Sequence, residues 1–396
     1  MKRFLVGGAV RDQLLGCPVG DRDWLVTGVS PQQLLELGYQ QVGRDFPVFL
    51  HPQTKEECAL PRCPTDGLTE RQQVEADLSL RDLTINAMAI GPDDELIDPL
   101  NGQADLNQRL LRHTPAFADD PIRVLRLARL GARYATLGFH PADETVALVK
   151  TLADAGKLET LVAERVWSEI DRALQESRPA VFFQTLRQCG ALSSILPELD
   201  RLFGVPQPEK HHPEIDTGIH SLMVLEQACR LSHEPEVRFA ALVHDLGKGV
   251  TPAAEWPHHR GHEERGVRLV LALCKRLRVP NKFSSLARQV TQYHTHCHKA
   301  AELKPGTVLK VLMALDCQRK PQRLEQFLTA CKADTRGRAG YEEKSYPQAE
   351  IFREALQAVT AVDCGALAWQ TDDPSKLPAL IAQQQTKAIA QRLSSL

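Results

Sequence analysis

The first residues of the chain combine a short apolar run with a glycine pair, which restricts how this end of the protein can fold. Residues 4–6 (Phe-Leu-Val) have the pattern of a buried strand, and Gly7 and Gly8 follow it directly. Because glycine has no Cβ, the backbone at this turn can approach a triphosphate closely. Arg11, three residues further on, is available to the phosphate oxygens.

Two carboxylates lie shortly after this turn. Asp21 and Asp23 precede a second apolar run, residues 24–26, and strand periodicity puts both side chains on one side of the sheet. Adjacent carboxylates can hold Mg²⁺ ions that activate a hydroxyl and stabilise a leaving pyrophosphate. The order of glycine pair, arginine and Asp-x-Asp therefore predicts a nucleotidyl-transfer site, with Asp21 and Asp23 as its catalytic, Mg²⁺-binding residues and Gly8 and Arg11 on the nucleotide. The alternative is an ordinary strand-to-helix turn followed by solvated acids.

A cationic stripe follows on a predicted helix that begins at Asp120-Pro121. Its arginines recur every three or four residues, at Arg123, Arg126, Arg129 and Arg133. A carboxylate accepts from the exocyclic amine of cytosine or adenine, and a guanidinium donates to ring acceptors, so an Asp–Arg pair could accept C and A and reject U and G. The alternative is a solvated amphipathic helix for which Asp120 is only the cap.

These segments resemble the class II tRNA nucleotidyltransferases, which are the CCA-adding enzymes and their poly(A) polymerase relatives. Residues 1–30 are similar to the family's opening, and residues 80–89 are similar to its Arg-Arg-Asp motif, which implies that Arg81 and Asp82 contact the sugar and phosphates of CTP or ATP. Residues 119–129 match the segment that reads the incoming base. The resemblance therefore implies that Asp120, Arg123, Arg126 and Arg129 bind the nucleotide. Residues 164–169 resemble the last head–neck motif, which braces the base-reading helix.

The fold class follows from periodicity and from this resemblance. Strand-like patterns, such as residues 46–50 and 95–99, are confined to the first hundred residues, and helical spacing follows. The resemblance implies an α+β protein: a polymerase-β-like nucleotidyltransferase head with a small mixed sheet, followed by an all-α neck, an HD-like body and a tail. With proline-rich breaks as boundaries, the predicted parts are 1–113, 114–205, 206–318 and 319–396.

A histidine-rich module suggests a second site. His220 opens one predicted helix, and His244-Asp245 closes another. Adjacent His and Asp can ligate a divalent ion that activates water for attack on a phosphoester. The module resembles an HD phosphohydrolase domain, which implies phosphatase, 2'-nucleotidase and 2',3'-cyclic phosphodiesterase activities and a transition metal such as Ni²⁺, Co²⁺ or Mn²⁺.

The module departs from the HD pattern at its last ligand. The family signature ends in a second Asp, and no Asp occurs between Asp245 and Asp316. Asp316 itself, or one of His294, His296 and His298, could complete the site. The alternative is a helical scaffold that has lost its metal.

A second departure concerns the product. The long flexible loop that relatives carry before the Arg-Arg-Asp motif is reduced here to residues 62–77, with no aromatic residue and a single glycine, and Leu80 replaces the first arginine of the motif. The family associates this loop with the switch from C to A addition. An enzyme that adds only CC is therefore an alternative to full CCA addition.

The expected partners are the tRNA 3' end, CTP and ATP, with no membrane. The chain has a net charge of −2 and no apolar segment of 18 residues, and the run after Met1-Lys2-Arg3 is too short for a signal peptide, so we expect a cytoplasmic protein. The sequence does not distinguish a monomer from a homodimer. Three other function classes stay open at this point. They are a poly(A) polymerase, a phosphohydrolase with an inert head, and a pure tRNA-binding module.

Overall fold

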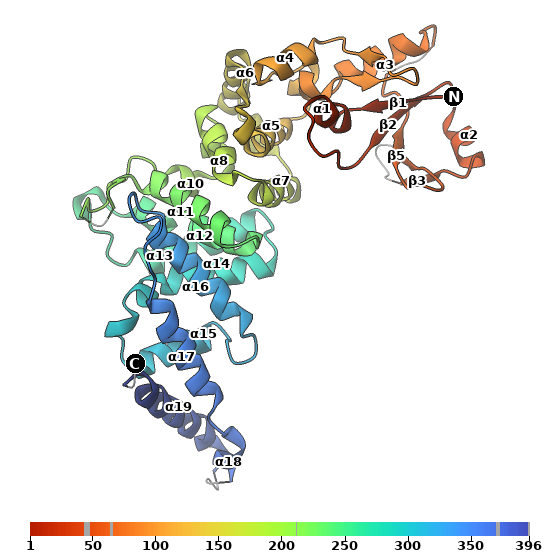
Figure 1. The fold of residues 1–396 in the computed structure, drawn as a ribbon. Helices are drawn as coiled ribbons and strands as arrows, with labels where there is room; N and C mark the ends of the chain where they lie inside the picture. Colours follow the sequence, from red (N-terminus) through yellow and green to blue (C-terminus); the bar gives the residue numbers. More distant parts are fainter. Residues whose placement is uncertain (43–47, 64–65, 211, 370–372, 395–396) are drawn as a thin grey trace. The chain divides into compact units, whose positions relative to one another are not determined.

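The computed structural model describes residues 1–42, 48–63, 66–210, 212–369 and 373–394 (Figure 1). The described chain divides into two compact units, Met1–Leu161 with Gln188–Ala191, and Val162–Arg187 with Leu192–Leu396. The first contains a mixed sheet and the second is helical, which confirms the predicted α+β class. The finer four-part division stays a prediction.

The first unit is built on a seven-stranded sheet in the order β3-β4-β5-β2-β1-β6-β7. Its strands are β1 (Lys2–Val6), β2 (Asp23–Thr27), β3 (Gln40–Val42), β4 (Val48–Leu50), β5 (Glu57–Ala59), β6 (Ala89–Ile90) and β7 (Leu96–Ile97). β2 pairs with β5 in parallel, and the other pairs are antiparallel. Of the strand predicted over 46–50, residues 48–50 form β4, and residues 46 and 47 lie outside the described residues.

Both faces of the sheet are covered by helices. Val6 and Leu25 belong to one buried cluster with α3 (Glu70–Ser79), whereas Val26 belongs to another with α2 (Pro31–Glu36). Leu25 and Val26 face opposite sides because side chains alternate along a strand. This two-sided packing fixes the direction of β2 and hence the position of the carboxylate at its start.

The first unit also contains helices beyond the sheet. They are α1 (Gly8–Leu14), α4 (Gly102–Gln108), α5 (Arg123–Arg133) and α6 (Asp143–Asp154), with 3₁₀ turns η1 (Thr84–Asn86), η2 (Pro115–Asp119), η3 (Ala135–Leu137) and η4 (Lys157–Thr160). The expectation that strands end within the first hundred residues is wrong in one respect, because β8 (Leu110–Leu111) pairs with β9 (His140–Pro141). Strands of two residues are too short to leave a period-two pattern in the sequence.

The second unit is formed by helices. They are α7 (Ala163–Gln175), α8 (Pro179–Gln188), α9 (Leu192–Ile195), α10 (Pro197–Asp200), α11 (Thr217–Leu231), α12 (Pro235–Val243), α13 (His262–Arg276), α14 (Asn281–His298), α15 (Pro305–Ala314), α16 (Gln322–Arg336), α17 (Gln348–Thr360), α18 (Cys364–Ala368) and α19 (Leu377–Leu393), with 3₁₀ turns η5 (Leu246–Val250), η6 (Ala253–Glu255), η7 (Ala300–Glu302) and η8 (Pro374–Lys376). Helices α11, α12, α14 and α16 pack on one another.

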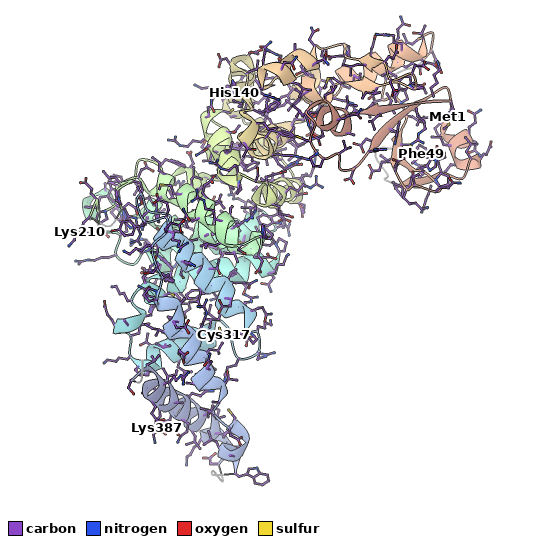
Figure 2. All side chains as sticks on the ribbon, in the orientation of Figure 1. Met1, Phe49, His140, Lys210, Cys317 and Lys387 are labelled. Atoms are coloured by element: carbon purple, nitrogen blue, oxygen red, sulfur yellow. The ribbon has the colours of Figure 1, made fainter. Side chains whose placement is uncertain are left out.

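Buried aromatic rings stabilise this helical unit. Trp167, in the segment that resembles the last head–neck motif, packs edge-on against Phe239 and Phe283 with ring centroids 5.3 and 4.9 Å away. Cys317, after α15, is also fully buried (Figure 2). Among the described helices, none is both long and apolar enough to cross a membrane.

Candidate functional sites

Three carboxylates meet at one end of the central strands. Register places Asp23 opposite Val6, the last residue of β1, and beside Glu57 on the parallel strand β5. A polar pocket of about 560 Å³ is lined by Asp21, Asp23 and Glu57 together with Gly20, Arg22, Thr54, Lys55 and Glu56. Partial burial, Glu57 and Asp21 together raise the pKa of Asp23. Mutual repulsion of this kind is relieved by a divalent cation, so these residues fit Mg²⁺.

The two predicted catalytic aspartates are brought together, although not as the strand pattern suggested. β2 begins at Asp23, so Asp21 lies in the turn before the strand, and the prediction that both sit on the strand is wrong for Asp21. Glu57 was missed. Its signal is a Glu-Glu pair directly before the apolar run Cys58-Ala59-Leu60, but only the parallel pairing of β5 with β2 places it beside Asp23.

The glycine turn lies against Arg81. Gly7 has φ +73° and ψ −132°, a conformation that is essentially restricted to glycine. A Cβ on Gly7 would lie 2.7 Å from Nη1 of Arg81, and a Cβ on Gly8, the first residue of α1, would lie 3.3 Å from Nη2 of Arg11. The turn therefore leaves room for two guanidinium groups close to the backbone.

Replacing Gly7 with alanine is expected to displace Arg81 and weaken nucleotide binding about tenfold, with a loss of stability of roughly 2–3 kcal/mol. Gly16→Ala is the matched control, since Gly16 also has a positive φ, +66°, but nothing lies within 4 Å of its added Cβ. Thermal unfolding and equilibrium binding of CTP would be measured for both. Equal losses of affinity in the two variants would show that the Arg81 contact has no effect.

Arg81 is held by the carboxylate of Asp77. Asp77 is fully buried and lies 3.5 Å from Nη2 of Arg81 and 2.9 Å from Nε of Arg62. Asp77 belongs to α3, so the prediction of a loop over 62–77 is wrong for residues 70–77. Those residues are helical because Thr69 and Gln72 form a capping box that starts α3.

The segment predicted to read the base has the expected stripe of arginines, but its helix, α5, starts later than predicted, at Arg123. Asp120 is extended, and its carboxylate accepts from the backbone N–H of Ile122 at 3.3 Å, whereas the N-cap of α5 is Ile122 itself and has no side-chain cap hydrogen bond. Arg123, Arg129 and Arg133 are half-buried and Arg126 is exposed, while most other side chains of α5 are buried. The helix therefore presents its arginines on one face, as predicted.

Two residues predicted to bind the nucleotide, Arg123 and Asp82, contact other groups of the protein. The Arg123 guanidinium donates to the carbonyl oxygens of Leu80 (2.8 Å) and Arg81 (3.3 Å), which ties α5 to the turn that carries Arg81. Asp82 accepts from the backbone N–H of Leu83 at 2.8 Å and lies 3.1 Å from Nη2 of Arg126. This geometry gives Arg123 and Asp82 a positioning role; their predicted contacts with nucleotide remain predictions.

The histidine-rich module forms a buried cluster in the second unit. His220, His244 and Asp245 meet as predicted, and each is at most 1% exposed. Nε2 of His244 lies 3.1 Å from Oδ2 of Asp245. Although burial opposes ionisation, His244 and Lys248 lower the pKa of Asp245 well below its usual range. A buried, ionised carboxylate among imidazoles is a donor set that fits a divalent transition metal.

A second aspartate, Asp334 on α16, joins the cluster. Its Oδ1 lies 3.1 Å from Nε2 of His220, and its Oδ2 lies 3.7 Å from Nε2 of His244. The prediction of Asp316 is wrong, because that side chain is 40% exposed beyond α15 and lies 4.0 Å from Arg319. The helix packing of α11, α12 and α16, rather than sequence proximity, selects the ligand.

The predicted histidine substitutes play different parts. Nε2 of His294 lies in the cluster, 3.6 Å from Oδ1 of Asp245. His298 lies behind the cluster with Nε2 2.6 Å from Oδ2 of Asp334, so it orients that carboxylate. His296 belongs to none of the ligand groups found among the described residues. His262, which sequence reasoning did not select, joins His294 at 3.3 Å.

Further groups surround the cluster. Glu214 lies 2.9 Å from Nδ1 of His220 and 3.0 Å from Nδ1 of His212, which leaves Nε2 of His220 facing Asp334. Lys248 is buried and its ammonium lies 2.7 Å from Oδ2 of Asp245, so it brings a positive charge to the site. A carboxylate behind a ligating histidine fixes its tautomer and orientation.

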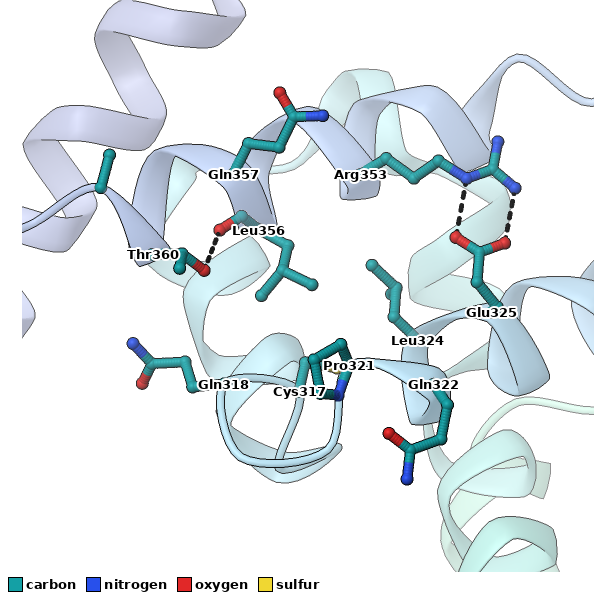
Figure 3. A pocket seen from close by; sticks show the side chains of 11 residues that line it. Cys317, Gln318, Pro321, Gln322, Leu324, Glu325, Arg353, Leu356, Gln357 and Thr360 are labelled. Carbon is teal, nitrogen blue, oxygen red and sulfur yellow. Dashed lines mark hydrogen bonds and ion pairs between the residues drawn. The ribbon is translucent and has the colours of Figure 1, made fainter.

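A separate cavity of about 740 Å³ lies between α16 and α17 (Figure 3). Its charged lining residues among those described, Glu325 and Arg353, pair with each other at 2.7 Å. The remaining lining is apolar or uncharged, as at Leu324 and Leu356. This cavity therefore offers no group for phosphate chemistry, and the histidine cluster remains the candidate site of the second unit.

Three family models match the chain. The poly A polymerase head domain matches residues 3–112, the probable RNA- and SrmB-binding site of polymerase A matches residues 138–203, and the HD domain matches residues 217–327. Asp334 lies beyond the residues matched by the HD domain.

Curated relatives match almost the whole chain. The Multifunctional CCA protein of Teredinibacter turnerae is 56% identical over 374 residues, covering 92% of this chain and 91% of the relative. That of Hahella chejuensis is 52% identical over 406 residues, covering 98% and 95%.

Solved structures share the fold. A CCA-adding enzyme in complex with CTP has a TM-score of 0.67 at 20% identity, covering 98% of this chain and 87% of that one. The Thermotoga maritima CCA-adding enzyme complexed with tRNA has a TM-score of 0.65 at 18% identity, covering 100% and 91%. The predicted family and fold class are confirmed. The chain belongs to the family of multifunctional CCA proteins, which are CCA-adding tRNA nucleotidyltransferases with an HD phosphohydrolase domain.

Proposed function

We propose that the head adds C, C and A to the 3' end of tRNA from CTP and ATP, without a nucleic-acid template, in the pocket of Asp21, Asp23 and Glu57. The observation that carries this proposal is the β1–β2 register, which puts the Gly7 turn and Asp23 at the same end of the sheet. A triphosphate on the turn then has its α-phosphate near the carboxylates. The tRNA 3'-hydroxyl attacks that phosphorus, and pyrophosphate leaves.

The protein would contribute positioning and charge. Asp21 and Asp23, with Glu57 beside them, would hold Mg²⁺, which when bound supplies charge neutralisation at the attacking and leaving oxygens. Gly8 and Arg11 would lie at the triphosphate, and Arg81 at the sugar end. Arg11 is 4% exposed in this structure, so its contribution includes orienting its neighbours.

Base selection would fall to the start and exposed face of α5. Asp120 would accept from the exocyclic amine of C or A, and Arg126 and Arg129 would donate to ring acceptors. U and G present the opposite pattern at the exocyclic position, so a fixed carboxylate rejects them. No template strand is needed for a choice of this kind.

The test uses purified protein, Mg²⁺ and two tRNA substrates, one ending at the discriminator base and one ending in CC, with products resolved to single nucleotides. Addition of A after CC supports the full assignment and shows that the short segment before α3 suffices. Growth that stops at CC supports the CC-adding alternative. Hydrolysis without any addition would mean that the head is inert.

The remaining expectations about the molecule's setting are also proposals. We propose a cytoplasmic protein whose partners are tRNA, CTP and ATP, acting as a monomer or homodimer. Proteins with the same fold include CCA-adding enzymes in complex with CTP, with ATP and with tRNA, which supports the choice of partners.

We also propose that the HD centre would hold two divalent ions, with Asp245 offering one carboxylate oxygen to the histidines on each side. Its two carboxylate oxygens face different histidines: Oδ2 lies 3.1 Å from Nε2 of His244, whereas Oδ1 lies 3.3 Å from Nε2 of His262. Neither Nε2 of His244 nor Oδ1 of Asp245 makes a hydrogen bond, although both atoms are buried. Buried polar atoms that have no hydrogen-bond partner, one on each of these two sides, indicate ligands for an ion.

The remaining donors extend these two sides, although the ligand atom of His294 also lies within 4.8 Å of those of His244 and Asp334. His220 and Asp334 join His244 on the Oδ2 side, and His294 joins His262 on the Oδ1 side. Burial lowers the pKa of His294 well below its usual range, so it is a neutral imidazole ready to ligate. Bound Ni²⁺, Co²⁺ or Mn²⁺ would supply an activated water for hydrolysis of 2',3'-cyclic phosphates, 2'-nucleotides and other phosphomonoesters.

Metal content tests this arrangement without an activity assay. Protein stripped with chelator and reloaded with Ni²⁺ or Mn²⁺ is expected to retain about two equivalents after dialysis at the high-affinity centre, and His262→Ala about one, since a single remaining histidine holds an ion poorly. His258→Ala, in an exposed neighbour, is the control. Because Asp21 and Asp23 add a weaker site, the count is made on Asp23→Asn protein. If the parent protein, His262→Ala and His258→Ala each retained one equivalent of metal, a second ion would be excluded.

A further inference from the structure

We propose that Asn86 and Tyr134 are positioning residues that join the phosphate-binding turn to the base-reading helix, so that base discrimination depends on side chains that contact no nucleotide. This inference rests on the proposed nucleotide transfer. It concerns a chain of polar contacts, here called the charged circuit, which is buried at Asp82, Asn86, Arg11, Asp12 and Tyr134 and partly exposed at its two ends, Arg126 and Arg133.

One half of the charged circuit is centred on Asp12, in α1. Its Oδ1 accepts from Nε of Arg11 at 2.9 Å and from the hydroxyl of Tyr134, and its Oδ2 accepts from Nη2 of Arg133 at 3.3 Å. The Arg11 guanidinium also stacks over the Tyr134 ring, 4.9 Å from the centroid. Asp12 and Tyr134 are each 3% exposed, so these contacts are shielded from water.

The other half is centred on Asn86, in η1. Its Oδ1 accepts from Nη1 of Arg11 at 2.5 Å, and its Nδ2 donates to Oδ1 of Asp82 at 3.0 Å. Oδ2 of Asp82 in turn lies 3.1 Å from Nη2 of Arg126. The single side chain of Asn86 therefore connects the arginine of the glycine turn to the aspartate of the Arg81-Asp82 pair.

Both ends of the charged circuit are on the same helix. Arg126 and Arg133 belong to α5 and lie about two helical turns apart, with Arg129 between them on the same side. The contacts therefore close a ring from α5 through η1 and α1 and back to α5. Such a ring would fix the rotation and height of α5 against the turn that receives the triphosphate, because a polar network with a buried centre favours one arrangement.

This ring would matter most for rejecting wrong bases. A site built on hydrogen bonds discriminates strongly only if its polar groups cannot move to suit an incorrect partner. When α5 is held in place, the Asp120 carboxylate faces the exocyclic oxygen of UTP, and two acceptors then oppose each other. When a contact of the charged circuit is lost, α5 can shift and relieve this mismatch. Loss of one contact in the charged circuit should therefore raise kcat/KM for UTP by a larger factor than it lowers kcat/KM for CTP.

The test compares Tyr134→Phe, which keeps the ring and removes one hydroxyl, with Asn86→Ala, which cuts the other half. The readout is the ratio of kcat/KM for CTP to that for UTP on tRNA ending at the discriminator base. Each variant is expected to lower this ratio about tenfold, the scale of one hydrogen bond to a charged group. The double variant should lose little more, because both cuts open the same ring.

Tyr39→Phe is the matched control, since Tyr39 is a buried tyrosine of the same unit that packs against His51. Its ratio should not change. A purely structural role predicts lower melting temperatures with an unchanged ratio in Tyr134→Phe and Asn86→Ala, and that result, or additive losses in the double variant, would overturn the inference.

A second readout separates this inference from the proposed function. Dissociation constants of CTP and UTP are measured without tRNA, where the ratio between them should narrow about tenfold in Tyr134→Phe. An unmodified protein that transfers no nucleotide refutes the proposed function, and the binding ratio still decides the inference. If the unmodified protein binds CTP and UTP with equal dissociation constants, the inference about Asn86 and Tyr134 is overturned.

Discussion

Replacing Asp23 with asparagine is expected to lower nucleotide transfer to tRNA about a thousand-fold, the scale of several kcal/mol of lost charge stabilisation in the transition state. Asp23 lies in register with Glu57 on β5, and the charges of Glu57 and Asp21 both raise its pKa. Its removal leaves the site one negative charge short for Mg²⁺. The measurement is the single-turnover rate of C addition to tRNA at saturating CTP.

The same substitution should leave the fold intact. Asp23 is exposed, and its pKa is raised by partial burial and the nearby acids, so removing its charge relieves repulsion in the metal-free protein. We expect an unchanged or slightly higher melting temperature and unchanged phosphohydrolase activity. Asp93→Asn, at an exposed aspartate between β6 and β7, is the control. Transfer by Asp23→Asn at the parent rate would refute the assignment of the pocket.

The second large effect is expected at Asp245. If it bridges two ions, Asp245→Asn removes a ligand from both at once, and hydrolysis of a 2',3'-cyclic nucleotide should fall about a thousand-fold. Nucleotide transfer should be retained. The variant also leaves the buried ammonium of Lys248 without its partner carboxylate at 2.7 Å, so a lower melting temperature is expected as well.

Asp316→Asn is the control for this prediction, because sequence reasoning offered Asp316 as a ligand and the structure places it outside the cluster. Its backbone has φ +57°, which asparagine tolerates. We expect full hydrolysis and full metal content in that variant. A loss of hydrolysis in Asp316→Asn with none in Asp245→Asn would refute the ligand set built around Asp334.

The parts of both sites that sequence predicted are those set by local rules. The glycine turn, Asp23 and the arginine face of α5 each depend on residues a few positions apart, where strand and helix periods apply. His244 and Asp245 are consecutive in the chain, so their proximity could be predicted without knowledge of the tertiary structure.

The residues that were missed depend on long-range packing. Glu57 reaches Asp23 only because β5 runs parallel to β2, and Asp334 reaches the histidines only because α16 packs on α11 and α12. Asp82 and Arg123 show a related limit, since the pattern marked them as charged residues at a site but not as partners of other protein groups. The spacing of charged residues along a helix does not show whether a guanidinium pairs with a group of the protein or with a bound nucleotide.

The assignment of the carboxylate pocket and of the histidine cluster to different compact units has an evolutionary consequence. Every residue proposed for transfer, from Gly8 to Arg129, lies in the first unit, and every proposed ligand of the HD centre, from His220 to Asp334, lies in the second. Selection on the two activities therefore acts on non-overlapping sets of side chains. A lineage that stops using the hydrolase can accumulate changes at Asp245 or His262 while its tRNA-finishing chemistry stays under constraint.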